Sequence, residues 1–270
     1  MTKARRMMQE NIRLIDIVIE LVDARCPLSS KNPDIDSLAS GKSRLILLNK
    51  SDMADDSKTV LWENYYREKG FYTLKINSRS GAGTKNVNSI VMKACAEKIE
   101  RDRKRGIKNR PVRAMIVGIP NVGKSTFINS YAGKACTKTG NKPGVTKGKQ
   151  WIKLRKDLEM LDTPGILWPK FDDENVGIRL ALTGSINDDI LDISELSLKL
   201  IDFLKVSYQS ALRDRYGVNE DNEPAQLLKE IAASRNCIMK GGEPDFEKAS
   251  RLLIDDFRSL RLGRITLESP

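Results

Sequence analysis

The chain has 270 residues, enough to bury a core without disulfides or a structural metal, and its net charge of +11 favours a polyanionic partner. It contains no histidine and only four well-separated cysteines, which excludes a typical zinc site and catalysis by a Ser–His or Cys–His pair. No apolar run approaches the roughly 20 residues that span a bilayer, so we expect a cytoplasmic protein without a membrane partner.

Short apolar runs alternate with helical stretches through the first two-thirds of the chain. The expected strands cover residues 15–22, 44–48, 72–76 and 114–117, and helices are expected near residues 56–69 and 84–104. Nearly continuous apolar strands separated by helices are typical of a mostly parallel sheet that is covered on both faces. We therefore predict an α/β domain over residues 1–170.

From about residue 171 helical periodicity replaces this pattern. Apolar residues recur at helical spacing through residues 196–204, 225–232 and 246–260. For the last of these helices we expect Asp245 as the N-cap and Gly263 as the stop. The pattern predicts a small α-helical domain over residues 171–270, in which residues 264–267 form either a short strand or a tail.

Charge is unevenly distributed along the chain. Residues 101–113 hold seven Lys or Arg and one Asp, and residues 134–156 hold eight Lys or Arg and no acid. Residues 171–200 instead carry seven acids and two bases. A charge run is usually a solvated face, and for residues 101–113 alone we favour that interpretation; together, the two basic blocks are equally compatible with a nucleic-acid footprint.

A phosphate-binding loop is the strongest motif. Residues 118–125 read GIPNVGKS, between an expected strand and an expected helix, and match the pattern G-x-x-x-x-G-K-S. The glycines let the backbone curl so that successive N–H groups and the helix N-terminus face a phosphate chain. We expect Lys124 on the β- and γ-phosphates and Ser125 on Mg²⁺. The predicted phosphate contacts of this loop are Asn121, Val122, Gly123, Lys124, Ser125 and Thr126.

Two further positions belong with this loop. Residues 162–165 read DTPG after an apolar run, and we interpret Asp162 as the carboxylate that holds Mg²⁺ through water. Gly165 is then expected to donate its N–H to the γ-phosphate. Between the two motifs, Thr146 is the candidate switch residue that closes on Mg²⁺ and the γ-phosphate. Neither interpretation holds without the phosphate loop, because both patterns are common.

A third motif is expected to recognise the base of a bound nucleotide. Residues 49–52 read NKSD at the end of an apolar run, and a simple turn after a strand is the alternative interpretation. The Asp52 carboxylate can accept from the ring N1–H and the exocyclic amine of guanine, while Asn49 assists and the Lys50 stem packs on the base. Adenine lacks this paired donor edge. The predicted base contacts are Asn49, Lys50, Ser51 and Asp52, together with Asn77 and Ser78 in the loop after the next strand.

The order of these motifs is unusual. Each follows an expected strand, so all should meet at the carboxyl edge of the sheet around one guanine nucleotide. The base-reading motifs at 49 and 77, however, precede the phosphate loop at 118. We therefore predict a circularly permuted P-loop GTPase domain, in which joining the old termini and opening another loop preserves the site.

With this order, the sequence resembles the circularly permuted ribosome-assembly GTPases of the YlqF/RbgA type over essentially the whole chain. The resemblance includes the segments VDAR at 22–25, PGVT at 143–146, DTPGILWPK at 162–170 and GRITL at 263–267. It implies GTP-dependent late maturation of the large ribosomal subunit, with GTP or GDP and that subunit as partners. It also implies a helical domain that contacts ribosomal RNA.

The candidate RNA contacts lie on the last long helix, with a solvated helix face as the alternative. They are Lys248, Arg251, Arg258 and Arg261. In the phosphate loop, Asn121 is a candidate K⁺ ligand, and bracing of the loop is the alternative role.

One position bears on hydrolysis. Ile166 stands where a glutamine orients the attacking water in Ras-like enzymes, and isoleucine cannot do so. The resemblance implies instead a histidine in an N-terminal Trp-Phe-Pro-Gly-His-Met segment, but this chain has no histidine and so no water-orienting residue. We hypothesise that the natural chain begins upstream, and that this form binds GTP but hydrolyses it poorly. The alternative to an enzyme is a nucleotide-gated RNA-binding scaffold.

Overall fold

The computed structural model describes residues 3–107, 110–133, 150–153, 156–163, 173–190 and 192–270. The chain forms two compact units. The first comprises Met1–Phe171 and Glu268–Pro270, and the second comprises Asp172–Leu267. The last three residues therefore return to the first unit.

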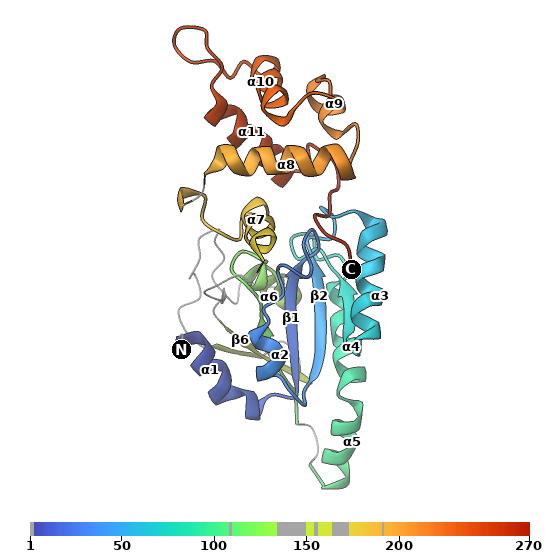
Figure 1. Ribbon diagram of the computed structural model, residues 1–270. Helices are drawn as coiled ribbons and strands as arrows, with labels where there is room; N and C mark the ends of the chain where they lie inside the picture. The colour runs from blue at the N-terminus through green and yellow to red at the C-terminus, as the bar shows by residue number, and fades with distance from the viewer. Residues whose placement is uncertain (1–2, 108–109, 134–149, 154–155, 164–172, 191) are drawn as a thin grey trace. The chain divides into compact units, whose positions relative to one another are not determined.

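The first unit contains a six-stranded sheet with the order β3-β2-β1-β4-β6-β5, in which only β5 is antiparallel to its neighbour (Figure 1). The strands are β1 Ile17–Asp23, β2 Ser43–Asn49, β3 Tyr72–Lys75, β4 Val112–Val117, β5 Gln150–Lys153 and β6 Leu158–Asp162. All residues of β1 are buried, as expected for a central parallel strand. The predicted α/β fold is confirmed.

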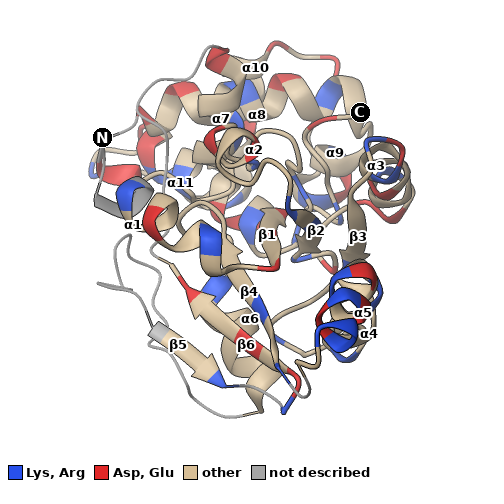
Figure 2. Cartoon of the chain, turned by 90° about the horizontal axis from the view of Figure 1, so that it is seen from below, with Lys and Arg blue, Asp and Glu red and all other residues tan. Residues whose placement is uncertain are grey.

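Helices cover both faces of this sheet. They are α1 Lys3–Asn11, α2 Asp34–Leu38, α3 Asp56–Glu68, α4 Val87–Ala94, α5 Ala96–Lys104 and α6 Lys124–Ala132, with 3₁₀ turns at Ile12–Leu14 and Thr84–Asn86. Helices α1 and α2 pack on one face through Met8 and Ile35, and α3 packs through Trp62 and Tyr66. Helices α4, α5 and α6 lie on the other side (Figure 2).

The second unit is helical. It contains α7 Glu174–Leu182, α8 Ile193–Ser207, α9 Ala211–Tyr216, α10 Pro224–Ser234, α11 Phe246–Arg258 and a 3₁₀ turn at Asp188–Ile190. Leu200, Leu228 and Leu253 belong to its core, in which α8, α10 and α11 pack together. Among the described residues, no helix combines the length and the apolar character that crossing a bilayer requires.

Two local expectations need correction, and one alternative is settled. The helix expected near residues 84–104 is divided at Cys95 into α4 and α5. Asp245 does cap α11 by accepting from the Lys248 N–H at 2.9 Å, but Gly263 is not its stop. The helix already ends at Arg258, because Leu260 adopts a left-handed conformation (φ 66°) that turns the chain back. Of the two alternatives for residues 264–267, the tail is the correct one, since they form no strand, and Ile265 is buried in the helical core.

The C-terminal tail is fixed to the first unit by one carboxylate. Glu268 accepts hydrogen bonds from the Leu28 N–H at 2.5 Å, the Ser29 N–H at 2.9 Å and the Ser29 hydroxyl at 2.5 Å. The Trp62 indole donates to the Glu268 carbonyl at 3.2 Å, and Figure 1 shows the C-terminus beside α3. These bonds attach the tail to the loop that follows β1.

Candidate nucleotide-binding site

The predicted loops meet at the carboxyl edge of the sheet. Asp23 and Asn49 are partners in the β1–β2 register, and Asp162 ends β6 opposite Ile116 of β4. The phosphate loop begins directly after β4. Because parallel strands end at the same edge, segments far apart in the sequence become neighbours there.

Two glycines allow the phosphate loop to pack against its neighbours. A Cβ on Gly118 (φ 151°) would lie 2.7 Å from the Leu21 carbonyl oxygen, and a Cβ on Gly123 (φ 100°) would lie 2.4 Å from Asn49 Nδ2. Asn121 is also left-handed, with φ 59°. The loop therefore approaches β1 and the base-reading motif more closely than any side chain at 118 or 123 would permit.

Asn49 joins the base-reading and phosphate loops. Its amide donates from Nδ2 to the Val122 carbonyl at 2.7 Å, and its Oδ1 accepts from the Ser78 N–H at 3.0 Å. The side chain is 2% exposed, so these bonds are protected from competing water. One residue thus holds three predicted nucleotide loops together.

Lys124 lies at the start of α6 and is 8% exposed. Its ammonium donates to the carbonyls of Gly118 at 2.8 Å and Ile119 at 2.7 Å. Burial lowers the pKa of Lys124 to about 8, although the nearby charge of Asp162 opposes this shift. A buried ammonium at a helix N-terminus that donates to two carbonyls is well suited to bind phosphate oxygens.

The lowered pKa of Lys124 predicts a pH-dependent affinity. Anionic phosphates favour the charged amine, so nucleotide binding raises its pKa above about 8 and takes up a proton at higher pH. GTP affinity should therefore fall by up to about tenfold per pH unit as the pH rises above 8. Isothermal titration at pH 8.5 in two buffers of different ionisation enthalpy should reveal the proton uptake. In Lys124→Arg the uptake should vanish, because guanidinium stays protonated; equal uptake in both proteins would contradict the assignment.

The oxygen donors predicted for a cation occupy two described positions. Ser125 lies in the first turn of α6, and the side chain of Asp162 is fully buried at the end of β6. Within the described part of the chain, no group of three or more His, Cys, Asp or Glu side chains could hold a metal on its own. Thr146, Gly165 and Ile166 lie outside the described residues.

A buried ion pair that the sequence motifs did not predict supports Lys50. Asp23 binds Arg25 through Nε at 2.9 Å and Nη2 at 2.8 Å, and the Lys50 ammonium lies 2.8 Å from the same carboxylate. Burial alone would raise the pKa of Asp23, but Arg25 and Lys50 hold it well below its usual value. This contact fixes the lysine of the base-reading motif, whose backbone is left-handed with φ 58°. Its sequence signal is the charged Asp-Ala-Arg segment at residues 23–25, at the end of the strand.

Replacing Asp23 with asparagine should destabilise the first unit by about 3 kcal/mol, because the buried Arg25 would lose the carboxylate that it contacts directly. Because the pKa of Asp23 is lowered in the folded protein, its contribution to the free energy of unfolding is complete above the ordinary aspartate pKa of about 3.9. That contribution declines as the pH falls below this value. Urea unfolding at pH 7 measures the loss. The exposed Asp56→Asn is the matched control, and equal stability of the two variants would refute the prediction.

The remaining predicted base residues lie in the segments that follow β2 and β3. Asp52 is half-buried, and its charge interacts with Arg25. Ser51 donates both its N–H (3.1 Å) and its hydroxyl (3.0 Å) to the Ile76 carbonyl, which joins the base-reading motif to the end of β3. Asn77 shapes the next loop, since its Oδ1 accepts from the N–H groups of residues 79 and 80. Ser78 is buried beside Asn49.

The candidate RNA residues of α11 differ in their surroundings. Lys248 is exposed, and Arg251 is exposed but pairs with Glu247 at 3.0 Å. Arg261 pairs with the buried Asp256 at 2.9 Å while its side chain stays 60% exposed. Arg258 instead binds Asp188 and also donates to the carbonyls of residues 181 and 182, so its guanidinium holds α11 to the end of α7.

Comparisons with known proteins agree with this geometry. A family model described as 50S ribosome-binding GTPase matches residues 113–238. A ribosome biogenesis GTPase A from Bacillus cereus is 48% identical over 100% of this chain and 92% of its own length. One from Thermotoga maritima is 31% identical over 99% of this chain and 91% of its own. The crystal structure of GNP-bound YlqF from T. maritima matches with a TM-score of 0.70 at 28% identity, covering 100% of this chain and 99% of that one.

The fold and the arrangement of the loops define a P-loop GTPase whose predicted base-reading segments precede its phosphate loop along the chain. By its similarity over the full length, the chain belongs to the ribosome biogenesis GTPase A family.

Proposed function

We propose that this protein binds and hydrolyses GTP while it assists the late maturation of the large ribosomal subunit in the cytoplasm. The observation that supports this most directly is the Asn49 side chain, which bonds the phosphate loop at Val122 and the base loop at Ser78. Such a bridge sets a fixed spacing between a base site and a phosphate site. A guanine nucleotide needs both at once.

The proposed contacts divide into two groups. The base contacts are Asn49, Lys50, Ser51, Asp52, Asn77 and Ser78, and the phosphate contacts are Asn121, Val122, Gly123, Lys124, Ser125, Thr126 and Gly165. Lys124 and the N-terminus of α6 supply positive charge where negative charge lies on the β- and γ-phosphates. Thr146 and Gly165 are the proposed switch positions that sense the γ-phosphate.

Mg²⁺ is the proposed cofactor, and the donors suit a hard cation. The Ser125 hydroxyl and the fully buried Asp162 carboxylate are oxygen ligands, with Asp162 acting through water and Thr146 as the further ligand. When bound, Mg²⁺ neutralises phosphate charge during hydrolysis. K⁺ is proposed as a second cation at Asn121, whose amide oxygen is a suitable ligand.

The proposed partner is the large ribosomal subunit and its ribosomal RNA. The relatives named ribosome biogenesis GTPase A and the family described as 50S ribosome-binding support this choice. The net charge of +11 suits binding to RNA phosphates. Within the helical unit, Lys248, Arg251 and Arg261 are the stronger RNA candidates, because the bonds of Arg258 stabilise the unit itself.

Sedimentation with immature large subunits tests this function. The protein should co-sediment with the particles in the presence of a non-hydrolysable GTP analogue and be released with GDP. A Lys124→Ala variant should lose the dependence on nucleotide. Equal binding in both nucleotide states, or none in either, would refute the proposal.

A further inference from the structure

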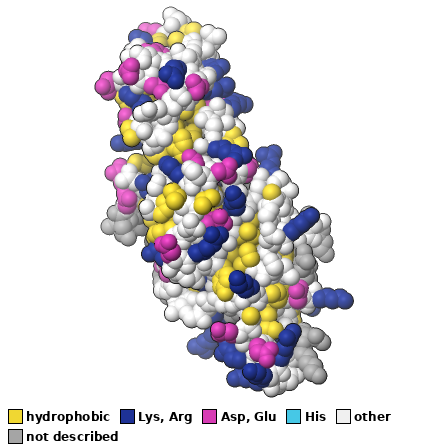
Figure 3. Space-filling model, turned by 90° about the vertical axis from the view of Figure 1, so that its right-hand side faces the viewer, with side chains coloured by type: hydrophobic (Ala, Val, Ile, Leu, Met, Phe, Trp, Pro, Cys, Tyr) yellow, Lys and Arg dark blue, Asp and Glu magenta, His cyan; other side chains and the backbone are white. Residues whose placement is uncertain are grey.

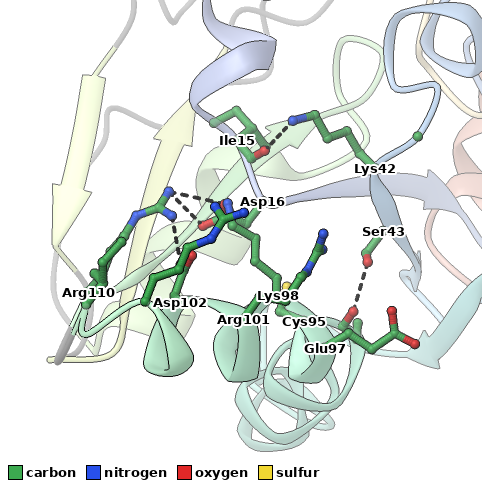
Figure 4. A pocket seen from close by; sticks show the side chains of 14 residues that line it. Ile15, Asp16, Lys42, Ser43, Cys95, Glu97, Lys98, Arg101, Asp102 and Arg110 are labelled. Carbon is green, nitrogen blue, oxygen red and sulfur yellow. Dashed lines mark hydrogen bonds and ion pairs between the residues drawn. The ribbon is translucent and has the colours of Figure 1, made fainter.

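A cavity of about 520 Å³ opens at the amino edge of the sheet, where β1, β2 and β4 begin. Its walls include Asp16 before β1, Ser43 at the start of β2, Arg110 before β4 and several residues of α5 (Figure 4). Figure 1 shows α5 at this end of the first unit. The nucleotide loops follow the opposite ends of the same strands, so the cavity is separate from the nucleotide site.

One buried carboxylate organises the cavity. Asp16, whose side chain is 4% exposed, binds the Lys98 ammonium, the Arg110 guanidinium at 3.2 Å and the Arg113 N–H at 3.0 Å. Arg110 also binds Asp102 at 3.0 Å. These bonds hold two cationic side chains in fixed positions at the wall, as Figure 4 shows. Their conformational entropy is therefore already lost before any ligand binds.

Among the described residues, no acid forms an ion pair with the remaining cations of the wall. Lys42 donates to the Ile15 carbonyl at 2.8 Å. Arg101 and Arg105 are exposed, and neither forms an ion pair with any described residue. The charged lining comprises five cations (Lys42, Lys98, Arg101, Arg105 and Arg110) and three acids (Asp16, Glu97 and Asp102). In Figure 3, Lys and Arg side chains gather over the end of the molecule that carries α5, with a few acids between them.

The dipole of α5 does not by itself explain why cations gather at this cavity. Basic residues in the last turn of α5 do stabilise the carbonyl end of that helix. Lys42 and Arg110, however, come from the segments before β2 and β4, and they converge on the same cavity. A concave surface with an excess of one charge focuses its electrostatic field on an incoming ion of opposite charge.

We propose that this cavity binds the phosphate backbone of RNA, as a second contact of the GTPase unit with ribosomal RNA. The choice of RNA rests on the proposed ribosomal function. The excess of cations suits phosphodiesters, and none of the described residues that line the cavity has an aromatic side chain to stack on a base. The contact is therefore positional and independent of sequence. Because it lies at the amino edge, it leaves the nucleotide site accessible.

Arg101→Ala/Arg105→Ala tests the proposal, since both side chains are exposed and their loss should not unfold the protein. Binding to a single-stranded RNA of about 20 nucleotides is measured over a series of salt concentrations. The affinity should fall roughly tenfold at low salt, and the slope of log K against log salt should become shallower by about 1.4, for two lost phosphate contacts. A second RNA of different sequence should show the same loss, and GTP affinity should not change.

The matched control is Arg67→Ala/Lys69→Ala, which removes two exposed cations from the end of α3. An unchanged salt slope in the α5 variant, or an equal change in the control, would overturn the proposal. Polyglutamate of the same charge is a further competitor for the bound RNA. If it displaced that RNA as strongly as unlabelled RNA does, the cavity would be assigned to an acidic protein segment instead. A wild-type chain that binds no RNA would also refute the ribosomal function, whereas wild-type binding with an unaffected α5 variant would refute the cavity proposal alone.

Discussion

Replacing Lys124 with alanine is expected to weaken GTP binding by a factor of roughly 10² to 10³. The ammonium is positioned at the N-terminus of α6 and can exchange its bonds to the carbonyls of Gly118 and Ile119 for charge-assisted bonds to phosphate oxygens. Two such bonds are worth about 3–4 kcal/mol in total. Part of this is offset, because removing a buried ammonium also removes its desolvation cost.

A nucleotide-binding titration of the folded variant measures the effect. Lys69→Ala, which removes an exposed lysine at the end of α3, is the matched control and should bind GTP as the wild type does. Circular dichroism and urea unfolding should show that Lys124→Ala keeps its fold. GTP affinity within about threefold of the wild type in a folded Lys124→Ala protein would show that the phosphates bind elsewhere.

The fold was predictable because its signals are local. Each parallel strand is a short, nearly continuous apolar run, and helices with their own periodicity separate the strands. The phosphate loop was equally accessible, because its pattern of glycines, lysine and serine is contiguous along residues 118–125. The close contacts with Leu21 and Asn49 that require glycine at positions 118 and 123 are long-range and became visible only in the structure. Once the motifs were assigned to strand ends, the parallel topology brought them together.

The supporting interactions could not be predicted in this way. The Glu268–Ser29 bonds join residues 239 positions apart, and the Lys98–Asp16 pair spans 82 positions. Nothing in the local sequence distinguishes either carboxylate from a solvated one. Arg258 illustrates the same limit, because a basic residue on an amphipathic helix suggests a surface contact, whereas its guanidinium bonds carbonyls within the unit.

The division of α4 from α5 at Cys95 has a similar origin. The sequence from 84 to 104 is continuously compatible with a helix, and only the packing of Val87 and Val91 in the first unit distinguishes the buried α4 from the charged α5. Helix α5 then carries Arg101 at the wall of the amino-edge cavity.

Asp52→Asn is expected to reverse the preference between GTP and xanthosine triphosphate. The carboxylate offers two acceptors to the N1–H and the exocyclic amine of guanine, whereas an asparagine amide offers one acceptor and one donor. The asparagine NH₂ group would face the exocyclic amine of guanine, and two donors cannot bond each other. The same NH₂ group could donate to the carbonyl that xanthine carries at that position. Unpaired groups of this kind discriminate by about 10⁴, so GTP affinity should fall by about 10³ or more while that for xanthosine triphosphate rises.

Competition between the two nucleotides for binding measures the reversal. Asp56→Asn removes the same charge from an exposed position at the start of α3 and should leave the GTP preference intact. Because Asp52 interacts electrostatically with Arg25, a small general loss of affinity for both nucleotides is expected as well. If the variant lost affinity for both nucleotides equally, so that the ratio of the two affinities did not change, Asp52 would support the loop without recognising the base.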